Sequence, residues 1–499
     1  MSKSHLISKG RLADELAKAG HDVTVLELDF LQISQSINSV KLAKRQIIGD
    51  FRHGAEFKSV ISGFSSSVMD DSSFIDELQN KWAYHNTYHK LCAELLERDE
   101  LFQELKNQNF DGFFAEHVNL CGIAYAQALG IQRKFLISSC TFTAIVYEYT
   151  GLSMPLSVVP VTTDLSMEPT WYERARNLLA ASLLRIEYQF LNGYLREVFQ
   201  NKFGQVFPSI YDIVSNVDVV FIATDEIIDI STTTLHNIVH VGGLGLDTNI
   251  PPLDTVFSAE MEKGSYGVVY FSLGTVANTT KLDSKVMENV LAIVKKFPEL
   301  HFLIRADKYD VKTREKAKFI PNVFVSDWLP QPAILNHPRL KLFITHSGYN
   351  SIVEAARAGV PLINIPFMFD QNLNSRSVEK KGWGVRRHKR QLLDEPEAIE
   401  EDIREVINNK KYKEKAERMK NLIKSKPMSP SQLLVKTTEW AIQNKGLEEL
   451  KFVSRSESTR IFYNLDVILP ILVILSLVVL KVLKSCFVSI FTVGKLKVE

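Results

Sequence analysis

The stretch of residues 328–371 constrains the fold of this chain more than any other part of its sequence. Within it, residues 342–345 are a short apolar run typical of a buried parallel strand. After a short turn, residues 350–358 are predicted to form a helix that ends at Gly359, and residues 362–365 form a second buried strand. A strand–helix–strand unit of this kind belongs to an open parallel sheet, in which ligands bind beyond the carboxyl ends of the strands.

Three polar residues of this unit indicate a nucleotide. His346, Asn350 and Glu354 are spaced by four residues, which predicts one stripe along the helix. The helix N-terminus offers free backbone N–H groups and a partial positive charge, which suit a phosphate. A carboxylate one turn further along is placed to accept both hydroxyls of a ribose. The order of phosphate and then ribose therefore predicts a nucleotide site.

The same stretch resembles the signature of UDP-glycosyltransferases, and most closely that of animal, nematode-like UDP-glucuronosyltransferases. The shared frame is Trp-x-x-Gln, then His-x-Gly-x-Asn-Ser-x-x-Glu, Gly-x-Pro and Asp-Gln. Weaker similarity extends from Ser4-His5 to the apolar C-terminal segment. Ser347 departs from the frame, because the family often has Gly there. Since Ser is small, we expect the turn to form with a negative φ at this residue.

The resemblance implies a UDP-sugar site whose residues come from several loops. Trp328 would stack on the uracil, although a buried Trp that packs a loop is the alternative. Asp370 would bind sugar hydroxyls, but it also precedes a predicted helix and suits an N-cap. An ordinary strand-to-loop turn is the alternative for residues 272–275. The implied site residues are Ser272, Gly274, Thr275, Trp328, Gln331, His346, Gly348, Asn350, Ser351, Glu354, Asp370 and Gln371.

The resemblance also implies a general base in the first half of the chain. A histidine with an ordinary pKa of about 6.5 suits removal of the proton from an acceptor hydroxyl. By resemblance this base is His5, and the carboxylate that orients it is Glu116. The family more often has Asp at that position, and Glu reaches one methylene further.

Composition excludes several other classes. The formal net charge of +1 gives no indication of nucleic-acid binding. The four cysteines form no disulfide scaffold and no zinc-ligand spacing. No Asp-x-Asp pair is present to clamp a divalent metal on a nucleotide-sugar. We therefore expect no metal and no cofactor, with UDP-glucuronate or UDP-glucose as the co-substrate.

Apolar runs that alternate with helical segments predict two α/β domains. In the second half these runs lie at residues 267–273, 301–305, 323–325, 342–345 and 362–365. By resemblance, two doubly wound Rossmann-like domains form the GT-B architecture, followed by a C-terminal transmembrane helix. The expected parts are an acceptor-binding domain at 1–240, a linker at 241–262, a UDP-sugar-binding domain at 263–428, a bracing helix and juxtamembrane segment at 429–460, a transmembrane helix at 461–483 and a cytosolic tail at 484–499.

The N-terminus lacks features that the family has. Residues 1–17 contain no apolar core of signal-peptide length, and a first helix is predicted only at residues 11–19. We expect that the signal peptide and first strand are missing, either through a truncated start or in a variant that enters the membrane by its tail.

The C-terminal segment predicts a single membrane span. Residues 461–483 are long enough to cross a bilayer, and four lysines lie at or beyond the end of the apolar core, which predicts a cytosolic tail. The last five residues resemble a dilysine retrieval signal of endoplasmic-reticulum membrane proteins. A luminal body would expose Asn278, the asparagine of the one glycosylation sequon.

These observations lead to one main hypothesis. The chain transfers a sugar from a UDP-sugar to a hydroxyl of a small lipophilic acceptor, with inversion and without metal, as a UDP-glucuronosyltransferase-like membrane protein. A homo-oligomer is compatible with the resemblance. One alternative is a catalytically impaired, membrane-anchored nucleotide-binding or partner subunit. Another alternative, a soluble nucleotide-sugar epimerase of similar fold, leaves the apolar tail unexplained.

Overall fold

The structure is a computed structural model that describes most of the chain. The described residues are 3–66, 69, 74–141, 144–161, 165–246, 250–274, 277–368, 370–452 and 459–495. The chain divides into two compact units, Met1–Lys451 and Phe452–Glu499. The first unit contains every β-strand of the described residues, and the second is helical.

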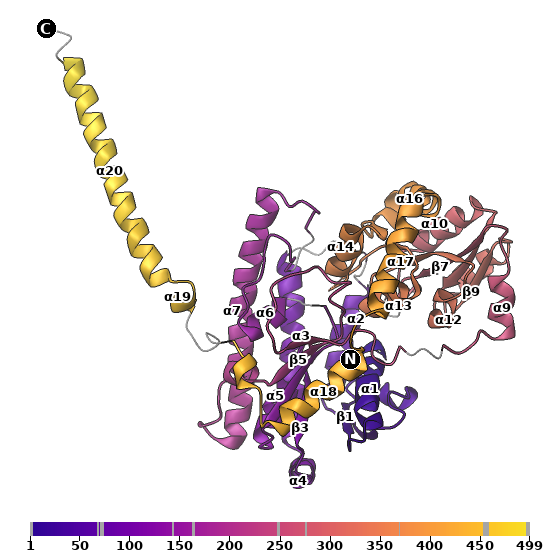
Figure 1. Ribbon diagram of the computed structural model, residues 1–499, viewed down its shortest axis with the longest axis horizontal. Coiled ribbons are helices and arrows are strands. Elements are labelled where there is room, and N and C mark those ends of the chain that lie inside the picture. Colours follow the sequence, from indigo (N-terminus) through magenta and orange to yellow (C-terminus); the bar gives the residue numbers. More distant parts are fainter. Residues whose placement is uncertain are drawn as a thin grey trace. The chain divides into compact units, whose positions relative to one another are not determined.

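The second half of the large unit is built on a six-stranded parallel sheet (Figure 1). Its spatial order is β12-β11-β10-β7-β8-β9, which is the order of a doubly wound nucleotide-binding sheet. The chain runs outward from β7 to β9 and then returns to the other side of β7, so the switch point lies between β7 and β10. The strands are β7 Gly267–Ser272, β8 Leu300–Arg305, β9 Val323–Ser326, β10 Leu340–Thr345, β11 Leu362–Asn364 and β12 Gly384–Arg386.

Strand β7 is buried on both faces, as its continuous apolar sequence predicts. Val269 and Phe271 join one core with α10 and α16, whereas Val268 and Tyr270 join another with α13 and α17. The five predicted strands of this half are confirmed, and β12 was missed because its sequence, Gly-Val-Arg, contains little apolar character. The helices are α9 Thr255–Met261, α10 Ser284–Lys295, α11 Val311–Ala317, α12 Gln331–Leu335, α13 Tyr349–Ala358, α14 Gln371–Lys381, α15 Gln391–Asp394, α16 Pro396–Asn408 and α17 Lys410–Lys424.

The first half contains two separate parallel sheets. One pairs β1 with β2, and the other has the order β3-β4-β5-β6. Among the described residues, β1 and β3 form no ladder with each other. The strands are β1 Thr24–Leu28, β2 Lys44–Ile48, β3 Gly112–Glu116, β4 Arg133–Ser138, β5 Val219–Ile222 and β6 Ile238–His240, and the helices are α1 Lys3–Lys18, α2 Gly54–Ser66, α3 Phe74–Leu96, α4 Asp99–Asn107, α5 Cys121–Ala128, α6 Ala144–Thr150, α7 Trp171–Phe203 and α8 Ile210–Ser215.

Helix α1 begins eight residues earlier than the sequence predicted. Leu6, Leu12 and Leu16 are all buried, so the apolar face continues through the polar-rich first turns. A Cβ on Gly10 would collide with the backbone carbonyl of Ser39. Gly10, which disfavours an isolated helix, is therefore required for the close approach of α1 to the chain after β1.

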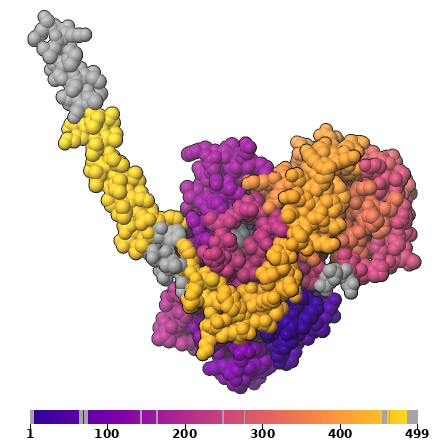
Figure 2. Space-filling model, viewed as in Figure 1, coloured from indigo at the N-terminus to yellow at the C-terminus, as the bar shows by residue number. Residues whose placement is uncertain are grey.

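Helix α18 (Pro430–Gln443) returns from the second half to cover the first. A capping box between Ser429 and Gln432 begins it. Its Leu434 and Ala441 are buried with Phe135 of β4 and Val219 of β5. Figure 2 shows this orange segment as a band across the surface of the molecule.

A disulfide joins Cys92 of α3 to Cys121 of α5, and both residues are buried. It closes a loop that contains α4 and β3. The sequence analysis predicted no disulfide scaffold, and spacing alone did not indicate that these two cysteines meet. Cys140 is free.

The second unit contains α19 (Thr459–Phe462) and α20 (Leu465–Lys495). In α20 the segment Leu465–Lys484 has a mean hydropathy of 2.6, and none of it is buried against the rest of the described chain. It is long and apolar enough to cross a membrane. The predicted apolar helix is therefore present, but it begins at Leu465 rather than at residue 461. The retrieval-like signal at residues 495–499 lies outside the part whose side chains are described.

Candidate functional site

The switch point of the second sheet holds His346 between two glycines. His346 follows β10, and Gly274 follows β7. A Cβ on Gly274 would collide with the imidazole, and a Cβ on Gly348 would lie 2.5 Å from its Nε2. Gly274 also has a φ of 74°, which favours glycine. The two glycines therefore let the ring enter the corner where a doubly wound sheet binds phosphate.

The His346 ring is neutral at physiological pH. Desolvation, and then the nearby cation of Arg305, lower its pKa to about 4. A neutral imidazole can donate one N–H to a phosphate oxygen while its other nitrogen remains an acceptor. His346 thus provides a hydrogen bond without a charge.

Arg305 provides the positive charge that the sequence analysis did not identify. It ends β8, and its Nη1 donates to the carbonyl of Gly274 over 2.6 Å. Its Nη2 pairs with Asp307 over 3.2 Å. An arginine at the carboxyl end of a predicted strand was the available signal, because all such ends meet at one edge of the sheet.

The turn at Ser347 forms, but with a φ of 67° rather than the expected negative value. Ser347 is fully buried, and its hydroxyl donates to the Asn364 side chain over 3.1 Å. Asn374 donates to its carbonyl over 3.1 Å. These bonds offset a left-handed backbone that costs a non-glycine residue about 1–2 kcal/mol.

Helix α13 begins at Tyr349, so the predicted three-residue stripe is wrong in one respect. Asn350 and Glu354 lie on the helix, whereas His346 lies before it. The N-cap is Gly348, which has no side chain to cap the first turn. The N–H groups of that turn are consequently available to an anion beside His346.

Gln331 brings a second group of predicted residues together. Its Nε2 donates to Glu354 over 2.7 Å and to the Ser351 hydroxyl over 3.3 Å. Its Oε1 accepts from Tyr270 over 3.1 Å. Desolvation raises the pKa of Glu354. The carboxylate is thus held at the N-terminus of α12 by the side-chain amide of Gln331, which fixes its direction.

Trp328 lies in the segment between β9 and α12. Its side chain is 61% exposed. The alternative of a buried packing residue is therefore wrong, because most of the side chain is exposed to solvent.

A third group surrounds Asp370, which precedes α14. Asn374 donates to its carboxylate over 2.9 Å, and desolvation raises the pKa of Asp370. Asp370 occupies the N-cap position but makes no side-chain cap hydrogen bond. The side-chain oxygen of Gln371 accepts from the backbone N–H groups of Phe367 and Met368 at 2.8 and 3.2 Å. This side chain therefore stabilises the loop that precedes α14.

Glu116 is the centre of a buried polar cluster in the first half. Its carboxylate pairs with Lys9 over 2.8 Å and with the His117 Nδ1 over 2.8 Å. It also accepts from the Ser139 hydroxyl over 2.7 Å. Burial alone would raise the pKa of Glu116, but Lys9 and then His117 lower it well below its ordinary value. Glu116 is therefore ionised.

His5 lies in the first turns of α1, close enough to Glu116 for an electrostatic interaction. Desolvation lowers its pKa to about 4, although Glu116 acts in the opposite direction. The hydrogen bonds described for Glu116 go to Lys9, His117 and Ser139 instead. Sequence reasoning missed Lys9 and His117, which both contact the carboxylate.

The two halves meet close to these groups. The backbone N–H of Thr141, after β4, donates to Asp370, and His117 also acts on that carboxylate electrostatically. Nearby, Asp229 of the first half receives hydrogen bonds from Thr224, Tyr349 and Thr141. Burial raises the pKa of Asp229 to about 7. Glu116 and Asp370, which belong to opposite halves, therefore both lie close enough to His117 and Cys140 to interact with them electrostatically.

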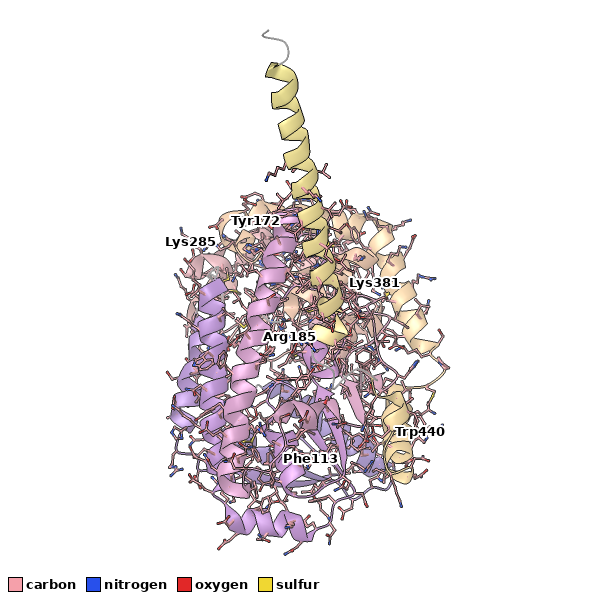
Figure 3. The ribbon with its side chains drawn as sticks, turned by 90° about the vertical axis from the view of Figure 1, so that its left-hand side faces the viewer. Phe113, Tyr172, Arg185, Lys285, Lys381 and Trp440 are labelled. Atoms are coloured by element: carbon pink, nitrogen blue, oxygen red, sulfur yellow. A yellow bond between two sulfur atoms is a disulfide. The ribbon has the colours of Figure 1, made fainter. Side chains whose placement is uncertain are left out.

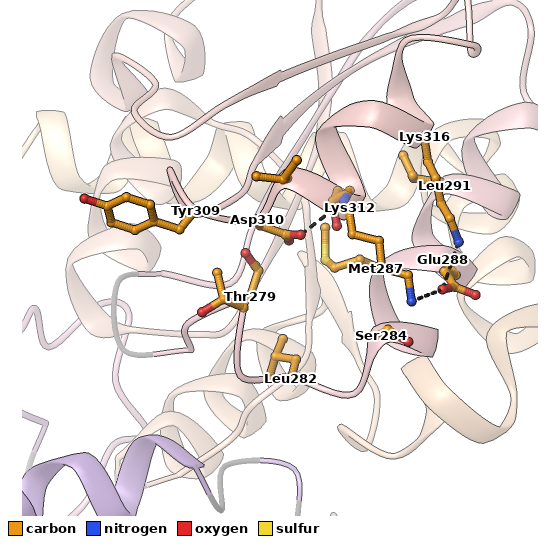
Figure 4. A pocket seen from close by; sticks show the side chains of 13 residues that line it. Thr279, Leu282, Ser284, Met287, Glu288, Leu291, Tyr309, Asp310, Lys312 and Lys316 are labelled. Carbon is orange, nitrogen blue, oxygen red and sulfur yellow. Dashed lines mark hydrogen bonds and ion pairs between the residues drawn. The ribbon is translucent and has the colours of Figure 1, made fainter.

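The region after β7 contains a cavity and the glycosylation sequon of Asn278. Thr275 lies outside the described residues. Asn278 accepts from the hydroxyl and backbone N–H of Thr280 at 2.6 and 2.9 Å. Beside them is a cavity of about 220 Å³ (Figure 4). Its walls include Thr279, Tyr309, Asp310 and Lys312, none of them a predicted donor-site residue.

No group of three or more His, Cys, Asp or Glu side chains suited to a metal ion occurs among the described residues. The donors in the phosphate corner are instead a guanidinium, an imidazole and backbone N–H groups.

Comparison with known sequences gives one consistent family. A family model described as "UDP-glucoronosyl and UDP-glucosyl transferase" matches residues 1–497. The chain is 68% identical to "Putative UDP-glucuronosyltransferase ugt-46" of Caenorhabditis elegans, over 94% of this chain and 88% of that protein. It is 27% identical to human UDP-glucuronosyltransferase 1A3, over 97% of this chain and 89% of that protein.

Solved structures give the same fold. UGT2 of Phytolacca americana, complexed with UDP-2fluoro-glucose and pterostilbene, aligns with a TM-score of 0.60 and 16% identity. The alignment covers 88% of this chain and 97% of that one. At this identity the likeness concerns the fold, and it agrees with two doubly wound domains of the GT-B type.

Proposed function

Because this chain belongs to the UDP-glucuronosyl and UDP-glucosyl transferase family and transfers a sugar from a UDP-sugar, we propose that it does so without a metal ion, by inversion, on small lipophilic alcohols or phenols. Membership of the family favours this activity over a catalytically impaired partner subunit. The observation that carries the proposal is the His346 ring between Gly274 and Gly348 at the switch point of the second sheet.

In this proposal the second half binds UDP. The uracil stacks on exposed Trp328, and the ribose hydroxyls bond to Glu354, which Gln331 orients. The diphosphate meets His346, Arg305 and the first turn of α13. The guanidinium supplies a charge that a metal ion supplies in other glycosyltransferases, and the free N–H groups add their dipoles.

The sugar then lies toward Asp370 and the first half. The acceptor oxygen attacks the anomeric carbon, its new C–O bond forms as the bond to UDP breaks, and UDP leaves on the opposite face. His5 takes the hydroxyl proton as general base. Ionised Glu116 stabilises the resulting imidazolium through space, while Lys9 and His117 hold the carboxylate in place.

We favour UDP-glucuronate over UDP-glucose as the donor. The support is the printed name of the 68% identical nematode relative, together with two cations close to residues of this proposal, Lys9 beside Glu116 and Arg305 beside Gly274. A glucuronate carboxylate requires such a cation nearby.

We further propose an endoplasmic-reticulum protein with a luminal body. The buried Cys92–Cys121 disulfide suits an oxidising compartment, and the Asn278 sequon suits a luminal surface. The α20 helix would anchor the chain, with its lysines on the cytosolic side. Carbonate extraction of membranes tests the anchor, since release of the chain into the supernatant contradicts it.

Titration calorimetry of UDP in excess chelator tests the donor site. We expect binding that persists without magnesium or manganese and that falls at least tenfold in the His346→Ala, Glu354→Ala double variant. Turnover with UDP-glucuronate and UDP-glucose under the same conditions decides the donor. Unchanged binding in the double variant, or a requirement for metal, contradicts the assignment.

A further inference from the structure

Helix α7 exposes an apolar face that no part of the described chain covers. Its inner face, which includes Leu184, Leu191 and Leu195, is buried in the core of the first half. The opposite face carries large side chains at spacings of four, three, four and four residues, which is one continuous helical stripe. Its members are Leu179, Leu183, Ile186, Phe190 and Tyr194, each between 36% and 67% exposed.

The N-terminal end of the helix extends this stripe with aromatic residues. Trp171 is 75% exposed and Tyr172 is 68% exposed. Arg174 and Arg176 are exposed within the same two turns. Figure 3 shows α7 as a long straight helix at the front of the molecule, with Tyr172 near one end and Arg185 near its middle.

The size of this face requires an explanation. Single exposed apolar residues are ordinary on a soluble surface, whereas a contiguous row of this length marks an interaction site. From Tyr172 to Tyr194 the stripe runs for roughly 33 Å, at 1.5 Å per residue. A straight, one-sided apolar row with aromatic residues at both ends and two arginines near one of them is the composition of a helix that lies in a membrane interface.

The chain itself indicates which surface covers the stripe. Residues 452–464 connect the large unit to the apolar helix α20, whose 20-residue window is unburied. Thirteen residues span at most about 45 Å when fully extended. If α20 crosses a bilayer, the large unit cannot move further than this from the same bilayer.

We propose that the exposed face of α7 docks on the lipid surface of the membrane in which α20 is anchored. The apolar stripe enters the boundary between headgroups and acyl chains, and Arg174 and Arg176 meet lipid phosphates. The inference rests on the membrane anchor of the proposed function. It has a consequence for that function, because the half of the protein that carries His5 then lies against the phase where lipophilic acceptors dissolve.

Quenching of Trp171 by brominated lipids tests the docking in the full chain. The protein is reconstituted into nanodiscs of phosphatidylcholine with a minor share of phosphatidylserine, with or without bromine on the acyl chains. The Trp171→Phe variant isolates the contribution of this residue from that of the other four tryptophans. We expect the Trp171 component to lose at least half of its intensity in brominated discs.

A triple variant, Leu179→Gln with Ile186→Gln and Phe190→Gln, tests the stripe itself. All three positions are exposed, so the fold and the affinity for UDP should be retained, and the quenching should fall by more than twofold. A matched control changes three exposed apolar residues of the second half to Gln, and we expect it to leave the quenching unchanged. These residues are Val256, Tyr309 and Phe319.

The outcomes separate docking from anchoring. A chain that fails to copurify with nanodiscs contradicts the anchor and with it the docking. Copurification without quenching of Trp171, or quenching that survives the triple variant, contradicts the docking alone. A triple variant that lowers the number of chains per disc, without any quenching in the parent, shows that a second copy covers the stripe instead.

Discussion

A side chain on Gly274 and the imidazole of His346 cannot occupy the same space, because a Cβ at position 274 would collide with the ring. Gly274 follows β7 and His346 follows β10, the two strands that flank the switch point. The pair therefore couples the loops that follow β7 and β10, in which the two residues are 72 positions apart in sequence. Substitutions at Gly274 should act on the donor site through His346.

The Gly274→Ala variant should weaken UDP binding by roughly tenfold or more, since the ring must leave its position. The Gly130→Ala variant is a matched control, because Gly130 also has a positive φ but has nothing within 4 Å of its missing Cβ. Both variants place a Cβ on a residue with a positive φ, so both should lose some stability. Titration calorimetry that finds equal UDP affinities for the two would contradict the coupling.

Removing the charge of Glu354 should affect binding and stability in opposite directions. Glu354→Gln replaces an acceptor for ribose hydroxyls and for Gln331, so UDP affinity should fall about tenfold. Because desolvation raises the pKa of this carboxylate, its ionised form is unfavourable in the folded protein. The unliganded variant should consequently keep or gain melting temperature. Loss of stability with unchanged affinity is the opposite pattern and would assign Glu354 a purely structural role.

The pH dependence of turnover should report on His5. A base acts in its deprotonated form, and the pKa of His5 is lowered to about 4 by desolvation. The rate should therefore stay level from pH 8 to about pH 5.5 and decline only below it, rather than near 6.5. His5→Ala should lose about 10²–10⁴ in kcat with nearly unchanged UDP affinity. Glu116→Gln should lose less. Full activity of His5→Ala excludes it as the base.

Asp229 should make the folded protein less stable as the pH rises. Its pKa is raised by burial from an ordinary 3.8 to about 7, so the folded state holds a proton that the unfolded state releases. This contribution is complete below pH 3.8, declines as the pH rises toward 7 and is absent above it. Between these limits, the free energy of unfolding should fall by at most about 4 kcal/mol because of Asp229.

The Asp229→Asn variant removes this titration. We define the difference as the melting temperature of the variant minus that of the parent. This difference should be larger at pH 8 than at pH 5, because the cost of altered hydrogen bonds does not change with pH. If the melting temperatures of variant and parent differ by the same amount at pH 5 and at pH 8, the result contradicts the burial of an ionisable carboxyl at the junction of the halves.

Loss of the Cys92–Cys121 disulfide should destabilise the first half. The two cysteines are 29 residues apart in sequence. For a loop of this length the chain-entropy model predicts that the disulfide adds about 3–4 kcal/mol to the free energy of unfolding. The Cys92→Ser variant should therefore unfold at lower denaturant concentration, whereas Cys140→Ser, at the free cysteine, serves as the control. Mass spectrometry without reductant checks the pairing, and free thiols at both positions would contradict an oxidising location.

Local patterns predicted much of the architecture. Residues 342–345 and 362–365 were predicted as strands because buried parallel strands are continuously apolar, and Gly359 marked the end of α13 with a left-handed φ of 71°. Strand β12 was missed because its sequence, Gly-Val-Arg, lacks the continuous apolar run that marked the other strands. The start of α1 was missed because only packing against the chain near Ser39 explains Gly10 within a helix.

The sequence by itself determined the family frame, the five apolar strands of the second half and the apolar C-terminal helix, since these depend on residues close together in the chain. Only the tertiary structure decided that Arg305 lies beside Gly274, that Lys9 and His117 surround Glu116, and that Cys92 meets Cys121. Contacts of this kind join residues from different strands and helices. Their distances follow from how sheets and helices pack, which no local spacing of residues contains.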